Sequence, residues 1–254
     1  MLFDTHAHMN DPAFDADRDE LLSSFPAQGI GLMVNIGCSL ESSYDCSAMA
    51  EKYPYIYATV GSHPDSANEV NDDVLEAYRK LCKQNPKIKA IGEIGLDYYY
   101  EDIPRDIQKK AFIMQLELAR ELNLPVVVHE RDAHQDGMDI IRRFPDVTGV
   151  FHCYSGSAEM ARQLTKLGWY IGFTGVLTFK NARKAVESAQ AIPLDRIVIE
   201  TDCPFRSPEP FRGKRNDPSR VRYVAQKLAE LRGITPEEAE RITYENGKRL
   251  YRSD

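Results

Sequence analysis

Apolar residues gather along the chain in runs about as long as β-strands, and these runs recur at regular intervals. Most runs are continuously apolar rather than alternating, which is typical of strands buried on both faces of a parallel sheet. About eight runs have this character: Met1–His6, Leu32–Gly37, Tyr55–Gly61, Ile88–Ile94, Pro125–His129, Thr148–His152, Trp169–Phe173 and Ile197–Glu200.

The segments between these runs have the spacing of amphipathic helices. From Phe112 to Leu122, apolar residues recur at three- and four-residue steps on one helical face. Asp217 followed by Pro218 predicts an N-cap and first helical residue, and Thr235–Glu238 has the pattern of a capping box that opens a last helix.

Strand and helix patterns that alternate about eight times predict one parallel α/β fold. We expect a single (β/α)8 TIM barrel that spans residues 1–254 as one domain, because no linker, charge block or internal repeat marks a boundary. An open, doubly wound sheet is the alternative. It loses support because no GxGxxG or Walker-type loop follows the first run.

Histidines and carboxylates lie at the ends of the predicted strands, where parallel α/β folds place their active sites. Five of the six histidines fall at or just after such an end, and Glu93 and Asp202 close two further runs. The residues that we expect to converge on one rim are His6, His8, His63, His129, His152, Glu93 and Asp202.

The pair His6 and His8 is the sharpest local signal. Residues two apart at a strand end point to the same side, so both imidazoles can bind one metal ion. Taken alone, His129 and His152 could equally be buried core histidines, and Glu93 could belong to a buried salt bridge. Taken together, six ligands exceed what one tetrahedral ion needs and favour two ions. Mixed imidazole and carboxylate ligands suit Zn²⁺, Mn²⁺, Fe²⁺ or Co²⁺, and Mg²⁺ less well.

Composition limits the remaining possibilities. The net charge of −7 argues against a protein that binds nucleic acid through a broad basic face, so a phosphodiester substrate would need metals and a few local arginines. The five cysteines are scattered without a CxxC pair, which argues against structural disulfides. No apolar stretch is long enough to span a membrane and the first residues lack a signal-peptide pattern, so we expect a cytoplasmic protein without a membrane or obligate protein partner.

Five ordered motifs carry a resemblance to a known family. The segments 2–10 (LFDTHAHMN), 92–98 (GEIGLDY), 125–131 (PVVVHER), 152–156 (HCYSG) and 200–204 (ETDCP) are similar to the motifs of TatD deoxyribonucleases, and residues 213–218 resemble the stretch after their last strand. The resemblance covers nearly the whole chain. It implies a TIM barrel of the amidohydrolase-like group, divalent metal ions and hydrolysis of DNA phosphodiesters by an exonuclease.

The roles of the metal ligands follow from the resemblance by position. His6, His8, Glu93 and Asp202 would hold one ion, and Glu93, His129 and His152 the other, with a hydroxide bound between the ions as the nucleophile. Asp202 and Glu93 are the expected catalytic residues, Asp202 because it can orient or deprotonate the attacking water. From their places at the rim and in the loop after the last run, the expected substrate contacts on single-stranded or frayed DNA are His63, Arg131, Arg212 and Arg215. His63 could equally cap a helix or brace a loop, Arg131 could pair with a carboxylate such as Asp97, and the arginine loop could be merely solvated.

Two rival hypotheses stay open at this point. The same scaffold could carry an amidase, lactonase or phosphotriesterase, since barrels change chemistry through their loops. A binding module without catalysis is the second rival, and the presence of every expected ligand speaks against it.

Overall fold

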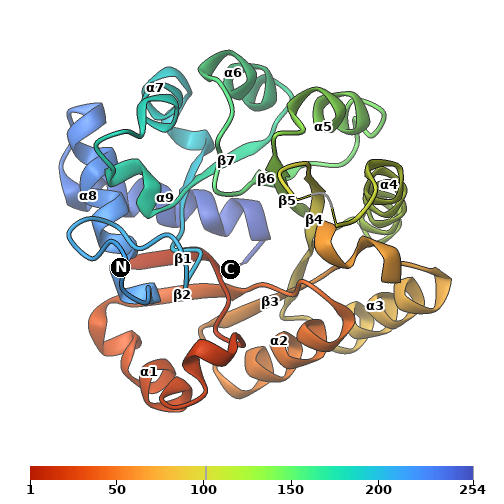
Figure 1. Cartoon of the computed structure of the whole chain (residues 1–254). Helices are drawn as coiled ribbons and strands as arrows, with labels where there is room; N and C mark the ends of the chain where they lie inside the picture. The colour runs from red at the N-terminus through yellow and green to blue at the C-terminus, as the bar shows by residue number, and fades with distance from the viewer. Residues whose placement is uncertain (101, 254) are drawn as a thin grey trace. The chain divides into compact units, whose positions relative to one another are not determined.

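The computed structural model describes residues 1–100 and 102–253 (Figure 1). Eight strands follow one another in one sheet in the order β1 to β8, and every strand is followed by a helix. The strands are β1 (Leu2–Ala7), β2 (Ile30–Asn35), β3 (Ile56–Val60), β4 (Ile88–Asp97), β5 (Val126–Arg131), β6 (Gly149–Phe151), β7 (Tyr170–Phe173) and β8 (Ile197–Ile199). All eight predicted strands are confirmed, and the fold class is (β/α)8.

The longer helices lie between and after these strands. They are α1 (Arg18–Ser24), α2 (Leu40–Lys52), α3 (Asp72–Gln84), α4 (Arg105–Leu122), α5 (His134–Ile141), α6 (Ala158–Lys166), α7 (Arg183–Ala191), α8 (Val221–Arg232) and α9 (Pro236–Tyr251). In the described part of the chain, none of these helices is long and apolar enough to cross a membrane.

Tertiary contacts divide the chain into two compact units. Unit 1 consists of residues 1–35 and 153–254, and unit 2 of residues 36–152. The expectation that residues 1–254 form a single domain stays a prediction. Each unit contains four of the strands and part of the predicted ligand set.

Unit 2 is built on the parallel strands β3 to β6. Ile94 of β4 pairs with Val128 of β5, and Gly95 pairs with His129, so the ends of these two strands run side by side. Gly95 has a φ of +140°, and a Cβ atom built on it would lie 2.0 Å from the carbonyl oxygen of His129. Only glycine permits this approach, which brings the backbone of β4 directly against the backbone of His129.

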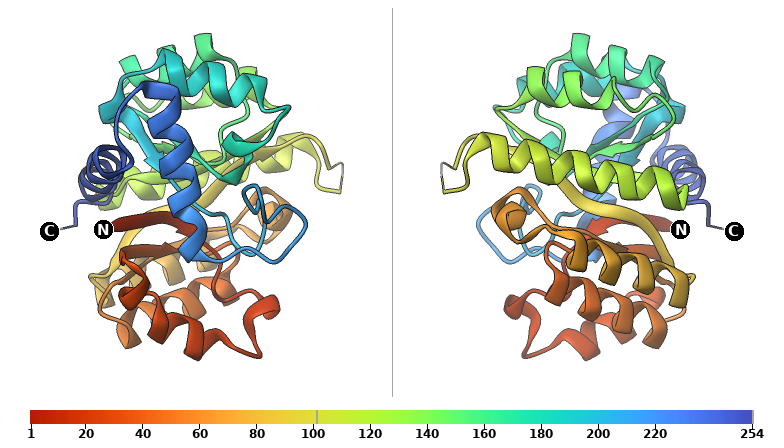
Figure 2. Two further views of the ribbon diagram at one scale, coloured as in Figure 1. Left: turned by 90° about the vertical axis from the view of Figure 1, so that its left-hand side faces the viewer. Right: turned by 90° about the vertical axis from the view of Figure 1, so that its right-hand side faces the viewer.

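Unit 1 pairs β1 with β2 and β7 with β8, and a bridge between Ala7 and Cys203 connects β1 to the segment after β8. Helices α8 and α9 cross steeply in this unit, as the two views of α9, lengthwise and end-on, make plain (Figures 1 and 2). The hydroxyl of Tyr251 at the end of α9 donates a hydrogen bond of 2.9 Å to the carbonyl of Thr5 in β1. The last helix therefore supports the strand that carries His6.

The helix patterns are confirmed in the main. Phe112 and Leu116 are buried on α4, and Thr235 accepts the amide of Glu238 at the start of α9. The predicted start of α8 needs a correction. Asp217 caps a short 3-10 turn at Pro218–Arg220, and α8 proper begins only at Val221, because the first turn is tightened into i to i+3 bonds.

Candidate active site

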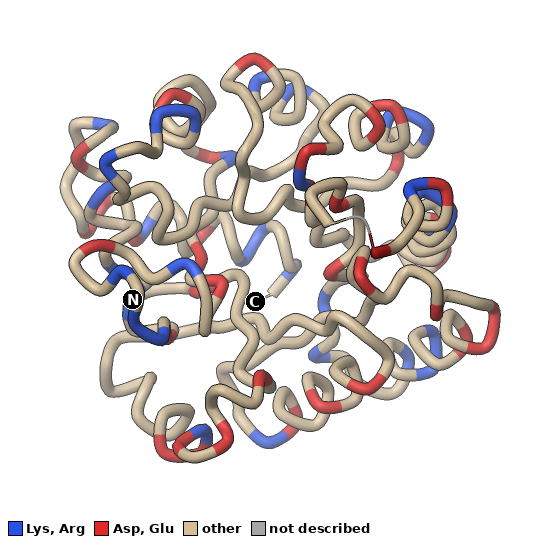
Figure 3. Tube along the Cα trace, in the orientation of Figure 1, with Lys and Arg blue, Asp and Glu red and all other residues tan. Residues whose placement is uncertain are grey.

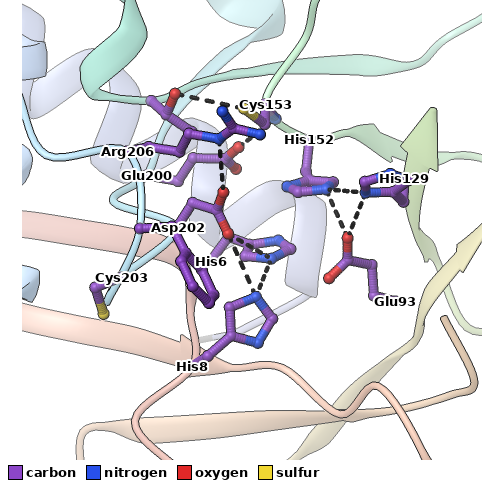
Figure 4. Close-up of polar contacts among 12 residues, drawn as sticks. His6, His8, Glu93, His129, His152, Cys153, Glu200, Asp202, Cys203 and Arg206 are labelled. Atoms are coloured by element: carbon purple, nitrogen blue, oxygen red, sulfur yellow. Dashed lines mark hydrogen bonds and ion pairs between the residues drawn. The ribbon is translucent and has the colours of Figure 1, made fainter. Parts of the chain in front are cut away.

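Three ligand-type side chains meet in unit 1, at the ends of β1 and β8. The Nε2 atoms of His6 and His8 lie 3.0 Å apart, and Asp202 Oδ1 lies 3.8 Å from the first and 3.4 Å from the second (Figure 4). We call His6, His8 and Asp202 the His6 group. The two histidines two residues apart do point to the same side, as the strand geometry predicted.

Backbone bonds fix the His6 group before any ligand arrives. The amide of Asp202 donates to the carbonyl of His6 at 2.9 Å, and the amide of His8 donates to the carbonyl of Cys203 at 2.9 Å. Asp202 has a φ of +54°, a left-handed conformation that is uncommon for residues other than glycine. Strained backbone of this kind is concentrated at functional sites, where the surrounding structure imposes it.

Asp4 connects β1 to the segment that follows β8. Its carboxylate is fully buried and accepts the amide of Thr201 at 2.9 Å and the Thr201 hydroxyl at 2.5 Å. Burial raises the pKa of Asp4 to about 7, against the opposing effect of these hydrogen bonds. Because Asp4 stands two residues before His6 and Thr201 one before Asp202, this contact sets the separation of two members of the His6 group.

A second set of three side chains meets in unit 2, and we call it the Glu93 group. Oε1 of Glu93 lies 2.7 Å from Nε2 of His152 and 2.9 Å from Nδ1 of His129, and these two nitrogens are 3.2 Å apart (Figure 4). Glu93 is only 3% exposed. Glu93 lies within β4, which continues to Asp97, so the expectation that Glu93 closes this run needs a correction; His129 lies in β5, and His152 directly follows β6. Three consecutive strands therefore supply one cluster.

His63 lies beside the Glu93 group. Its Nε2 is 3.8 Å from Oε1 of Glu93, and its ring packs edge-on against His129 with centroids 4.4 Å apart. Its Nδ1 lies 3.0 Å from Oδ1 of Asp65. His63, Glu93 and His129 offer three ligand atoms within 4.8 Å of one another. The geometry therefore permits a ligand role as well as the substrate role that we predicted.

The side chains of the three arginines expected to contact substrate have different partners. The guanidinium of Arg131 stacks 3.6 Å from the ring centroid of Tyr99, and that of Arg212 lies 4.4 Å from the Phe179 ring. Arg215 instead forms a two-pronged ion pair with Asp17, at 2.9 and 2.6 Å. The Lys and Arg residues on the loop after β8 are visible in Figure 3.

Comparison with known proteins identifies the family. A family model described as TatD related DNase matches residues 3–252. The chain belongs to the TatD family. YabD of Bacillus subtilis, described as an uncharacterized metal-dependent hydrolase, is 46% identical over 254 residues and 99% of each chain is covered. TatD of Cronobacter sakazakii, described as a 3'-5' ssDNA/RNA exonuclease, is 34% identical, with 98% of this chain and 97% of the relative covered.

The solved structures agree with this assignment. YJJV, a TatD homolog from Escherichia coli K12, has a TM-score of 0.92 and 30% identity, covering 99% of this chain and 98% of its own. The TatD resemblance and the TIM-barrel fold are thus confirmed. As a member of the TatD family, the chain is a metal-dependent hydrolase.

The donor sets of both groups fit divalent metal ions. In each group imidazole nitrogens and a carboxylate oxygen converge to within 3.8 Å, a spacing at which unshielded lone pairs repel unless a proton or a cation lies between them. Burial lowers the pKa of His129, but hydrogen bonds to Asp97 and Glu93 outweigh burial and raise it to about 9. A cation at this position would replace that proton.

Four residues around the TatD site were not predicted as neighbours of the candidate ligands. Asp97 lies 3.0 Å from Nε2 of His129, and Arg206 places its Nε 3.6 Å from Asp202 Oδ2. Asp4 and Glu200 are fully buried, and Glu200 accepts the amide of Cys153 at 2.6 Å. Carboxylates inside apolar strand runs, as at Asp4 and Glu200, were the signal that could have revealed two of them.

Proposed function

We propose that this TatD-family hydrolase cleaves phosphodiester bonds in DNA as an exonuclease, with the His6 group and the Glu93 group each holding one divalent cation. The observation that carries the proposal is the composition of the two groups: each brings at least one imidazole and one carboxylate, both buried, to within 3.8 Å. The relative from Cronobacter sakazakii, named as a 3'-5' ssDNA/RNA exonuclease, supports the choice of substrate.

The chain's own residues then have distinct tasks. Bound divalent cations would offset charge on the phosphate oxygens and lower the pKa of an attacking water. Asp202, with Oδ1 toward the two histidines and Oδ2 toward Arg206, is placed to accept the proton of that water and pass it on. Glu93 keeps His129 and His152 in place through Oε1, so its role combines metal binding with orientation.

The substrate would be held by local cations. A net charge of −7 does not attract a polyanion over the whole surface, so contacts must come from separate arginines. Arg131 and Arg212 each stack on an aromatic ring, which presents the guanidinium with little loss of side-chain freedom. His63 beside the Glu93 group is a further candidate contact. We further propose that the protein is cytoplasmic and that it prefers single-stranded DNA or frayed DNA ends.

The test compares four substrates on one preparation. We expect cleavage of bis(4-nitrophenyl) phosphate and of end-labelled single-stranded DNA with Mg²⁺, Mn²⁺ or Zn²⁺, and little turnover of a nitroanilide or a lactone. Elemental analysis of the purified protein identifies the bound metal. Faster turnover of the lactone or the anilide would replace the proposal by the amidase or lactonase hypothesis. An absence of turnover on every phosphodiester would support the binding module instead.

A further inference from the structure

A cavity of about 260 Å³ opens in unit 2 beside the Glu93 group. Its wall includes His63 and Asp97, which contact Glu93 and His129 respectively. Drug-sized ligands occupy pockets of roughly 300–1,000 Å³. This cavity is smaller and suits one ring system rather than several nucleotides.

The wall of the cavity offers flat and apolar surface. Pro64, Ile103 and Tyr100 line it, and Tyr100 is 58% exposed. Tyr99 next to it packs edge-on against the Tyr100 ring with centroids 5.0 Å apart, and Arg131 stacks on Tyr99. An exposed aromatic ring supported by a neighbouring ring is a surface on which a nucleic acid base can stack.

Acceptor groups complete the lining. Asp97 is occupied by His129 and by the amides of Tyr99 and Tyr100, and Asp65 is paired with His63. Asp102 is exposed and forms no hydrogen bond or ion pair with another residue that the structure describes. Its carboxylate is therefore available to accept hydrogen bonds from a ligand. Carboxylates on the wall repel phosphate, so the backbone of a nucleic acid does not belong in the cavity.

We propose that this cavity binds the base of the terminal nucleotide and prefers bases with an exocyclic amino group. The inference rests on the proposed nuclease function and adds a specificity site to it. Adenine, cytosine and guanine each present an amino group that can donate to Asp102 while the ring stacks on Tyr100. Thymine presents only an imide N–H between two carbonyl oxygens, and these oxygens would face the carboxylate unfavourably.

Binding of mononucleotides to the metal-loaded protein tests the proposal without any turnover. Calorimetric titration with dAMP, dCMP, dGMP and dTMP should show the first three binding about tenfold more tightly than dTMP, the weight of one hydrogen bond to a charged group. Asp102→Asn should remove this difference and Tyr100→Ala should weaken all four. Asp106→Asn, an exposed carboxylate nearby in α4 that does not line the cavity, is the matched control and should change nothing.

Hydrolysis of bis(4-nitrophenyl) phosphate, which has no base, separates this proposal from the nuclease assignment. Asp102→Asn should leave its turnover unchanged. If the diester is cleaved but the four mononucleotides bind equally well, or if Asp102→Asn keeps the difference, the base pocket is refuted. If the diester is not cleaved while the base preference persists, the nuclease proposal fails and the cavity stands as a nucleotide-binding site.

Discussion

The ring of His129 lies between two carboxylates, with Nδ1 2.9 Å from Glu93 and Nε2 3.0 Å from Asp97. A carboxylate on the outer nitrogen of a metal-binding histidine fixes the ring and raises its basicity. Asp97 is itself held by the amides of Tyr99 and Tyr100, so its orientation is set by the backbone after β4. Asp97 is thus a positioning residue for the Glu93 group.

Replacing Asp97 by Asn should weaken divalent metal binding by about 10- to 100-fold, because the ring of His129 is then without its orienting carboxylate. Titration with Zn²⁺ or Mn²⁺ against a competing chelator measures the effect. Asp139→Asn, an exposed aspartate on α5, is the control and should bind metal like the parent protein. Equal affinities in all three proteins would show that Asp97 only supports the tyrosine turn.

The pKa of His129 predicts two dependences on pH. Metal must displace the proton that the histidine holds below about pH 9, so affinity should rise with pH up to that value and binding should release a proton. Calorimetry in buffers of different ionisation enthalpy measures the proton release. Binding without proton release would contradict the assignment of His129 as a ligand.

In the metal-free protein, the stability that His129 contributes should fall as the pH rises. A histidine pKa raised from 6.5 to about 9 contributes stability that is full below pH 6.5 and is lost as the pH rises toward 9. Urea unfolding of chelator-treated protein should therefore show His129→Gln losing more stability at about pH 6 than at about pH 9.5. A difference independent of pH would mean that the ring is neutral in the absence of metal.

Glu93→Gln should lose bound metal and nearly all turnover while the protein stays folded. Glutamine keeps the size of the side chain but removes the charge that draws His129 and His152 together. Elemental analysis measures the bound metal, and circular dichroism checks that the protein is folded. Loss of two ions per chain would mean that Glu93 is shared between both ions, and loss of one would restrict it to the Glu93 group. Full metal content would refute the ligand assignment.

Asp202→Asn should lower turnover by at least about a hundredfold, the usual effect of removing a general acid or base. The same change should lower the affinity of the His6 group for its ion. Single-turnover rates at saturating metal separate the two effects, since excess metal restores occupancy but not proton transfer. A variant that recovers full activity at high metal would confine Asp202 to metal binding.

Arg212→Ala should raise the KM for DNA and make binding less sensitive to salt. For a single strand, the log–log slope should fall by about 0.7 for each phosphate that the variant no longer neutralises. Bis(4-nitrophenyl) phosphate should be hydrolysed as before. Arg215→Ala is the variant for comparison, because Arg215 is already paired with Asp17. If both substrates suffer equally in Arg212→Ala, the arginine supports the fold rather than the DNA.

The strands could be predicted, and so could the side chains that lie together in the His6 group and in the Glu93 group, because both depend on local pattern. Continuously apolar runs predict buried parallel strands, and several histidines that close such runs favour one shared site, although each of them alone could be a core residue. Asp97 could not be recognised in this way, since its role depends on the orientation of the His129 ring, which only tertiary structure shows. The pairing of Arg215 with Asp17 joins residues 198 apart and leaves no trace in either local segment.

The predicted start of α8 was wrong for a related reason. Asp217 and Pro218 have the preferences of a helix N-terminus, but those preferences do not distinguish an α-helical turn from a 3-10 turn. The cavity beside Tyr100 was equally out of reach. Its lining comes from segments that follow β3 and β4, and a cavity arises from how those segments pack rather than from what they contain.

Unit 1 is made of two separate segments of the chain, and this bears on the order in which the parts of the protein fold during synthesis. Residues of the Glu93 group all belong to the continuous stretch 36–152, whereas the bond from Thr5 to Ile199 beside the His6 group joins positions 194 apart. During synthesis at about 5–20 residues per second, the stretch 36–152 is complete before Asp202, the carboxylate of the His6 group, has been made. A nascent chain would thus acquire its ligand clusters one after the other, and the one that Tyr251 supports would come last.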